Sequence, residues 1–427
     1  MLGIPEKIVK NPGYKLHVVN TNKYKTNTLV WKMKAPLEKE TVTLRALLPH
    51  VLQSSTETYP STTKLRTYLD DLYGASLFVD LAKKGEYHIM TFTMEIANEK
   101  FLTDSTPLLA KAFELLTEII FKPNLENNAF TKDTVEKEKR TLKQRIQSIY
   151  DDKMKYSSVR LIEEMCKDEP FQLEANGVKE DVDAITPEAL YSYYKKALSE
   201  DEIDFYVIGD VSEEEVKNLA GQFITLEERA PKPVHRHERK SIETPQEVIE
   251  KQDVKQGKLN IGYRTNVYYG DEEYYALQVF NGIFGGFSHS KLFINVREKA
   301  SLAYYAASRL ESHKGLLLVM SGIDYKNYDK AVSIIKAQME AIQNGDFTEE
   351  ELSQTKAVIK NQLLETIDVA RGLVEVLYHN VMVGKDITLE EWFQKTDTVT
   401  KEDIVDVSKN IQLDTIYFLT GTEGQSE

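Results

Sequence analysis

The sequence predicts an α+β protein of two homologous domains, each a mixed, mostly antiparallel sheet with helices packed on one face. Three observations favour this fold class. Sequence features recur in the same order in both halves, a polar segment separates the halves, and some apolar strands are close enough in sequence to form hairpins. A chain of 427 residues is also too long for one hydrophobic core. We expect domains at 1–226 and 246–427, joined by a linker at 227–245.

The strongest repeat is a helix that begins after a threonine. Thr131 and Thr348 each follow a phenylalanine and precede acidic residues, as expected for an N-cap. The residues that follow have the same spacing in both halves: Lys139, Leu142 and Ile146 after Thr131, and Lys356, Ile359 and Leu363 after Thr348. This spacing predicts two helices with equivalent buried faces.

Other elements repeat in the same order. The sequence predicts helices that begin after Thr186 and Thr400 and lead to strands at 205–209 and 416–421, and helices that begin at Lys64 and Lys291 and precede strands at 89–94 and 316–321. Residues 76–81 and 88–94 are predicted to pair as a hairpin across 82–85. Three matches in one order make a chance repeat improbable.

The segment at 227–245 is rich in proline and basic residues and lacks apolar periodicity, which is typical of a linker. It contains His235 and His237, which fit a solvated linker better than a surface metal pair. The single cysteine, Cys166, excludes an internal disulfide. We expect this thiol to be buried and inert, with a pKa raised by the acidic neighbours Glu163, Glu164 and Asp168.

Composition excludes several classes of protein. A net charge of −14 argues against a nucleic-acid partner, whose phosphates would be repelled. Since no uninterrupted apolar run approaches the length of a membrane span, we expect none. Residues 1–7 lack the apolar core of a signal peptide, so a cytoplasmic location is expected.

The segment GGFSHSKLFINVREKASLAY, residues 285–304, resembles the second-domain signature of the pitrilysin/insulinase family of zinc metallopeptidases. The resemblance implies two clamshell-forming halves, with Arg297 and Tyr304 contacting the substrate backbone. A guanidinium and a phenol can both donate hydrogen bonds to an oxyanion. The alternative is structural: Arg297 would pair with Glu298, and Tyr304 would be half-buried in the core. Lesser candidates for peptide contacts lie in the same segment, in or after a tight turn: Gly285, Gly286, Ser288 and His289.

Active members of that family carry H-x-x-E-H, with two zinc ligands and a catalytic glutamate, and a third ligand on a later helix. Residues 56–61 resemble the segment that follows this motif, which places 46–50 at the motif itself. There the chain has Ala46 and His50 for the two histidines and Pro49 for the glutamate, while Arg145 stands at the third ligand. No pair among all eight histidines has the i, i+4 spacing, so no other register restores the site.

The resemblance therefore implies a chain without zinc and without peptidase activity of its own. Its partner would be a homologous, zinc-bearing subunit, and the heterodimer would cleave peptides or unfolded proteins. Some bacterial members of the family form such pairs. Two alternatives stay open: a structural or scaffold protein of the same fold, and an independent enzyme built around His50.

Overall fold

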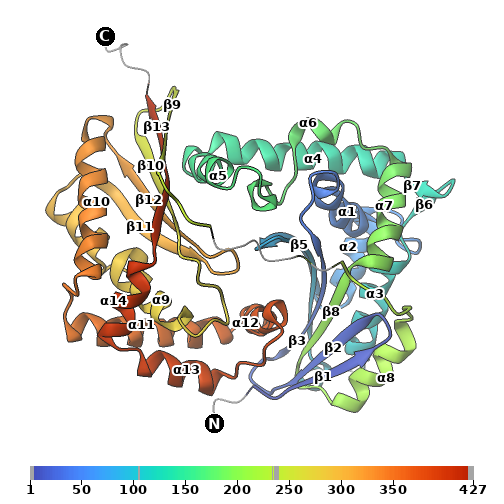
Figure 1. Cartoon of the computed structure of the whole chain (residues 1–427). Helices are drawn as coiled ribbons and strands as arrows, with labels where there is room; N and C mark the ends of the chain where they lie inside the picture. The colour runs from blue at the N-terminus through green and yellow to red at the C-terminus, as the bar shows by residue number, and fades with distance from the viewer. Residues whose placement is uncertain (1–3, 104–105, 233, 235–239, 422–427) are drawn as a thin grey trace.

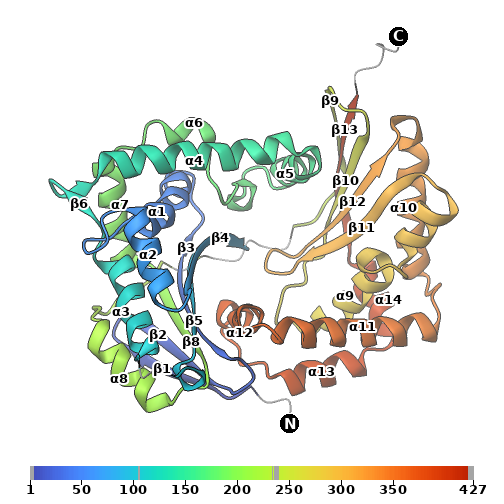
Figure 2. The ribbon, with the colours of Figure 1, turned by 180° about the vertical axis from the view of Figure 1, so that it is seen from behind.

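The computed structural model describes residues 4–103, 106–232, 234 and 240–421, so His235 and His237 lie outside the described residues. Two sheet-containing halves stand side by side, each with its own layer of helices on the outer side (Figures 1 and 2). The predicted fold class is confirmed, because both sheets are mixed and mostly antiparallel.

The first sheet has six strands in the order β1-β2-β8-β3-β5-β4, and only β2 and β8 run parallel. Its strands are β1 (Glu6–Asn11), β2 (Tyr14–Asn20), β3 (Thr26–Pro36), β4 (Ser76–Lys84), β5 (Tyr87–Ala97) and β8 (Glu202–Gly209), with a separate short hairpin of β6 (Leu125–Glu126) and β7 (Ala129–Phe130). The helices of this half are α1 (Val42–Ser54), α2 (Thr62–Asp71), α3 (Leu108–Phe121), α4 (Lys132–Asp151), α5 (Lys153–Met165), α6 (Lys179–Val182), α7 (Pro187–Glu200) and α8 (Glu213–Phe223), with 3-10 turns η1 (Glu99–Phe101) and η2 (Pro170–Gln172). Trp31 of β3 is fully buried at the centre of the core, between the rings of Phe205 and Phe121.

The second sheet has five strands in the order β11-β12-β10-β13-β9, and only β13 and β9 run parallel. Its strands are β9 (Gln246–Gln252), β10 (Gly257–Arg264), β11 (Ala303–Glu311), β12 (Leu316–Ile323) and β13 (Gln412–Gly421). The helices are α9 (Tyr274–Asn281), α10 (Tyr328–Gln343), α11 (Glu349–Ile367), α12 (Ala370–Val383), α13 (Leu389–Thr398) and α14 (Lys401–Lys409), with π-helices η3 (Gly282–Gly286) and η4 (Phe293–Lys299) and the 3-10 turn η5 (Tyr325–Asn327).

The repeated elements form where the sequence places them. Thr131 and Thr348 precede the equivalent helices α4 and α11, and Thr348 forms a full capping box with Glu351. The predicted hairpin is β4 and β5, but its turn is tighter than predicted: both strands continue to Lys84 and Tyr87, and Gly85 takes a φ of +56°. The tight turn predicted around Gly285 is wrong, because this segment continues α9 as the π-helix η3.

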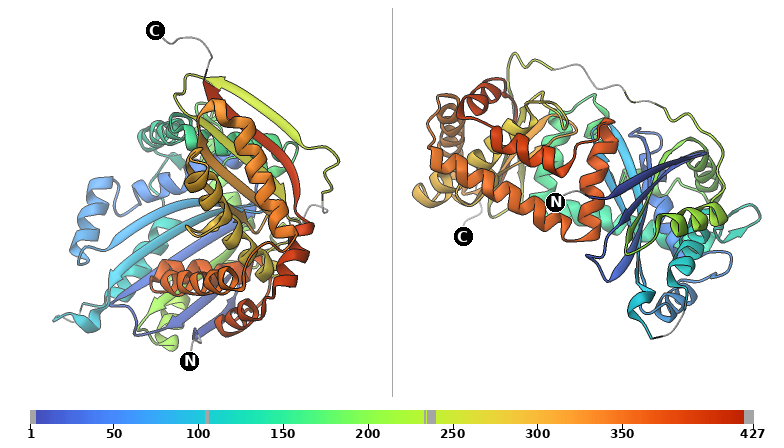
Figure 3. Two further views of the ribbon diagram at one scale, coloured as in Figure 1. Left: turned by 90° about the vertical axis from the view of Figure 1, so that its left-hand side faces the viewer. Right: turned by 90° about the horizontal axis from the view of Figure 1, so that it is seen from below.

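One helix from each half packs on the inner face of the other half's sheet. Apolar residues of α12 such as Val374 pack with Val30 and Ile208 of the first sheet. Reciprocally, Leu161 of α5 packs with Leu318 of the second sheet. Seen from below, α12 lies beside the strands of the first half (Figure 3). Because α5 and α12 directly follow the repeated helices α4 and α11, the exchange follows the internal repeat.

Cys166 lies at the second of these contacts and is fully buried, as expected. Burial raises the pKa of its thiol to about 11. The carboxylate that adds to the effect of burial is Glu169, not the predicted neighbours Glu163, Glu164 and Asp168. Glu163 and Glu164 instead pair with Arg160 at 2.5 and 2.6 Å.

A buried ionic network also joins the halves. Glu169 of the first half accepts hydrogen bonds from Arg264 Nη2 at 2.7 Å and Lys240 Nζ at 2.9 Å. Its other oxygen lies 2.7 Å from Lys314 Nζ, and Lys314 also pairs with Glu86. Three cations thus surround one carboxylate where the two halves meet.

Replacing Glu169 by glutamine should weaken this contact and change its response to acid. Burial raises the pKa of the Glu169 carboxyl, but hydrogen bonds from Arg264, Lys314 and Lys240 outweigh burial and lower it to about 2. Since the folded pKa lies below the unfolded one, the stabilisation is present above about pH 4.5 and is lost as the pH falls towards 2. Glu169→Gln should therefore cost roughly 3 kcal/mol near neutral pH.

Urea unfolding at a series of pH values measures this effect, with the exposed Glu57→Gln as the control. The stability of Glu169→Gln should depend less on pH between about 5 and 2 than that of the parent. An unchanged pH dependence would show that the network does not stabilise the contact.

Candidate functional site

The positions of the zinc motif lie on α1 and α4, which pack against each other. Ala46 is fully buried in the core, and Pro49 lies inside α1, where it removes one backbone N–H from the helix. His50, one turn after Ala46, is 8% exposed. Arg145 occupies the inward side of α4 and lies close enough to His50 to perturb its imidazole.

His50 and Arg145 line one pocket of about 340 Å³, whereas Ala46 and Pro49 are not among the residues that line it. The pocket lies between α1, α2, β4 and α4, and its polar lining is completed by Gln53, Ser54, Thr62, Arg66, Lys137, Glu138 and Thr141. Arg66, on α2, is a member of this site that the sequence did not reveal.

The residues present do not fit a zinc ion. Burial, followed by the positive charge of Arg145, lowers the pKa of the His50 imidazole to about 4. Of the described residues that line the pocket, His50 alone carries an imidazole, and the cation of Arg145 stands beside it. Across the part of the chain that the structure describes, no group of three or more His, Cys, Asp or Glu side chains is arranged to hold a metal ion.

Arg297 and Tyr304 lie in the second half, on η4 and at the start of β11. Tyr304 is 77% exposed, so it is not the half-buried core residue of the structural alternative. Arg297 is also exposed, and its guanidinium stacks 4.6 Å from the ring centre of Phe293. Among the described residues it forms no ion pair, with Glu298 or with any other carboxylate. Both polar groups are therefore available to a ligand.

The neighbouring candidates for peptide contacts differ in access. Gly285 is buried against β11, where a Cβ would lie 2.6 Å from Ser308 Oγ, so packing explains this glycine. Gly286 is half-buried beside Asn281. Ser288 is exposed, and His289 Nε2 is 2.9 Å from Thr355 Oγ1.

Strand β4 forms one edge of the first sheet. It begins at the pocket, since Leu77 lines the pocket and Gln53 Nε2 donates to the Leu77 carbonyl at 2.9 Å. Phe78 is 43% exposed on this strand, and the guanidinium of Arg371 lies 3.9 Å from its ring centre. The sequence did not reveal that this strand stands at an edge.

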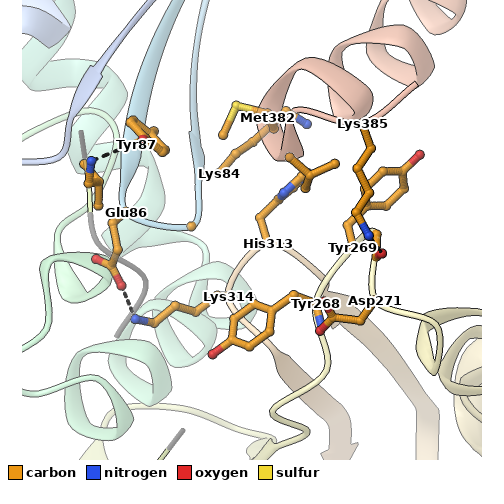
Figure 4. A pocket seen from close by; sticks show the side chains of 14 residues that line it. Lys84, Glu86, Tyr87, Tyr268, Tyr269, Asp271, His313, Lys314, Met382 and Lys385 are labelled. Atoms are coloured by element: carbon orange, nitrogen blue, oxygen red, sulfur yellow. Dashed lines mark hydrogen bonds and ion pairs between the residues drawn. The ribbon is translucent and has the colours of Figure 1, made fainter. Parts of the chain in front are cut away.

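A second pocket, of about 390 Å³, lies where the β4–β5 turn, the β11–β12 turn and the end of α12 meet (Figure 4). Its lysines already have partners within the protein. Lys314 pairs with Glu86 and Glu169, Lys84 Nζ lies 3.1 Å from Glu375, and Lys385 donates to a backbone carbonyl. This pocket therefore joins the two halves rather than offering free charge to a ligand.

Within the described residues, no helix combines the length and the apolar character that a membrane span requires.

Comparison with known proteins agrees with these features. Residues 184–359 match the family model described as the peptidase M16 inactive domain. Over 417 residues the chain is 56% identical to the probable inactive metalloprotease YmfF of Bacillus subtilis, covering 98% of each chain.

Solved structures show the same fold. The crystal structure of a conserved protein from Enterococcus faecalis superposes with a TM-score of 0.92 at 38% identity, covering 99% of this chain and 100% of the other. A protease from Helicobacter pylori superposes with a TM-score of 0.82 at 16% identity, covering 98% of this chain and 100% of the other, which shows the fold alone. The resemblance to zinc metallopeptidases is thus confirmed, and the chain belongs to the peptidase M16 family, among its inactive, YmfF-like members.

Proposed function

We propose that this chain is the non-catalytic subunit of a heterodimeric zinc peptidase in the cytoplasm. It holds the substrate backbone, and a homologous partner carrying H-x-x-E-H supplies the zinc. The observation that carries the proposal is an asymmetry between the two halves. The metal position in the first half keeps a single imidazole beside a cation, whereas Arg297 and Tyr304 in the second half are exposed. Among the described residues, Arg297 stacks on Phe293 but has no carboxylate partner that would explain its charge.

The fold supplies a route for the substrate in this proposal. An extended peptide can add to a sheet edge through main-chain hydrogen bonds, and β4 is such an edge. The two halves, 1–226 and 246–427, act as separate domains, one providing the edge strand and the other providing Arg297 and Tyr304. A guanidinium and a phenol would then stabilise the oxyanion that forms when the partner's zinc site attacks the peptide.

Replacing Arg297 by alanine tests the proposal. The full chain is combined with a homologous subunit that carries H-x-x-E-H, and cleavage of a fluorogenic peptide is measured. Removing one oxyanion donor should lower kcat/KM by about 100-fold. Tyr304→Phe should lower kcat/KM as well, because this substitution removes only the hydroxyl that donates the proposed hydrogen bond. Arg140→Ala, an exposed arginine on α4, should leave cleavage unchanged.

The second candidate is a scaffold protein of the same fold with no role in proteolysis. It predicts that Arg297→Ala assembles with the partner and cleaves the peptide at the parent's rate. That result would remove the shared-site proposal.

A further inference from the structure

The pocket at the former zinc position has an excess of positive charge. Arg66, Lys137 and Arg145 contribute three cations to its lining, and Glu138 contributes one carboxylate. Lys137 Nζ lies 3.3 Å from Glu138 Oε1, so the charges of this ion pair cancel. The pocket therefore keeps the two guanidinium groups of Arg66 and Arg145 without a compensating carboxylate among the described residues that line it.

Among the described residues, neither guanidinium has a carboxylate partner, and they differ in access: Arg66 is exposed to water, whereas Arg145 is half-buried. In the part of the chain that the structure describes, Arg66 and Arg145 form no ion pair, and Nη1 of Arg145 is buried without a hydrogen-bond partner. His50 is only 8% exposed, and its Nδ1 also has no hydrogen-bond partner among the described residues. A buried donor without a partner costs about 1–3 kcal/mol, and a charged one costs more. An anion in the pocket would remove this cost.

The position of the pocket beside strand β4 indicates which kind of ligand would carry the anionic group. The pocket opens beside the start of β4, and Leu77 of this strand lines it. A peptide added to the edge of β4 would therefore pass the mouth of the pocket, and one of its side chains or its end could enter. Two guanidinium groups suit a carboxylate, because arginine forms two parallel hydrogen bonds with its oxygens.

We propose that the former zinc pocket is now a binding site for a peptide carboxylate, held by Arg145 and Arg66 with His50 as an additional donor. This inference rests on the proposed peptide-binding function and names its preferred substrate: an extended peptide with an acidic side chain or a free C-terminus at the pocket. The family's cation site has thus become an anion site in this chain.

Four labelled peptides of one sequence test the inference with the full chain. They carry either Glu or Gln at an internal position and either a free or an amidated C-terminus, and fluorescence anisotropy gives each Kd. At least one carboxylate should tighten binding about tenfold, which is the effect of about 1.4 kcal/mol. The Glu/Gln pair reports a side chain, and the free/amidated pair reports the C-terminus.

The variants Arg145→Gln and Arg66→Gln should lose this preference while the uncharged peptide binds as before. Arg140→Gln, on the exposed side of α4, is the matched control and should keep the preference. Equal Kd values for all four peptides would overturn the carboxylate site but leave peptide binding, and with it the proposed function, in place. No binding of any peptide would overturn both. A carboxylate preference combined with normal cleavage by Arg297→Ala would keep this site and remove the proposed shared active site.

Discussion

Replacing Arg45 by methionine should destabilise the first half of the protein by about 3–5 kcal/mol, because it leaves a buried carboxylate without its cation. Arg45 is fully buried in α1, and its Nη1 lies 2.6 Å from a carboxylate oxygen of Asp201, which is itself 3% exposed. Burial lowers the pKa of the Arg45 guanidinium, but the charge of Asp201 outweighs burial and raises this pKa above its ordinary value. Burial also raises the pKa of the Asp201 carboxyl to about 6 in spite of Arg45, which shows how strongly the site penalises an isolated charge. Both partners of the pair are thus removed from water.

The guanidinium also joins several elements. It donates to the carbonyls of Met33 at 2.6 Å and His88 at 3.3 Å, and to the hydroxyl of Tyr193 at 3.2 Å. Its loss leaves these acceptors without a donor as well as leaving Asp201 without a cation. Methionine has a similar length, so the effect of a cavity is kept small.

Urea unfolding followed by circular dichroism measures the loss, and Arg140→Met provides an exposed arginine on a helix of the same half for comparison. The double variant Arg45→Met with Asp201→Asn should be more stable than the sum of the single changes predicts, because no unpaired charge stays buried. A loss below about 1 kcal/mol in Arg45→Met would mean that the pair contributes little.

Local sequence patterns predict the elements of this fold well, because a helix cap or an apolar period depends on near neighbours. Thr348 and its helix are an example. The exchange of α5 and α12 is different. Each is an amphipathic helix in the sequence, and nothing in its own residues says that its apolar face will pack on the sheet of the other half. That choice depends on how the two halves of the chain dock.

Ionic partners are equally hidden when they are distant in sequence. The sequence predicts that acidic neighbours raise the pKa of the Cys166 thiol, but Glu163 and Glu164 pair with Arg160, and burial is the main cause of the raised pKa. The network around Glu169 draws its cations from positions that are 71 to 145 residues away along the sequence, Lys240 and Lys314 being the two extremes. Only the folded chain brings them together.

The candidate site was predictable in part for the same reason. Its motif positions follow from the family resemblance of the flanking segments, and the structure brings His50 and Arg145 into one pocket. The sequence does not predict Arg66 as a site residue, because Arg66 belongs to no motif and reaches the pocket from a different helix, α2. Its contribution matters, since without Arg66 the pocket would keep one uncompensated guanidinium in place of two.

If the pocket descends from a zinc site, replacing Ala46 by His, Pro49 by Glu and Arg145 by Glu should make the chain bind zinc. The first and third changes place a second imidazole and a carboxylate around His50, since residues four apart share one face of α1 and α4 packs against it. Two imidazoles, a carboxylate and a water are a complete catalytic-type coordination sphere. The change at Pro49 also restores a backbone N–H to the middle of α1.

The decisive comparison is with the variant that has Ala46→His and Pro49→Glu but keeps Arg145. Metal analysis after dialysis should find about one zinc per chain in the triple variant and far less in the double variant, because a guanidinium next to His50 repels a dication. The triple variant should also lose the preference for acidic peptides, since a carboxylate now stands where Arg145 attracted one. Circular dichroism confirms that both variants fold. Equal zinc in the two folded variants would show that Arg145 does not stand at the third ligand position, and that the charge of this pocket arose for another reason.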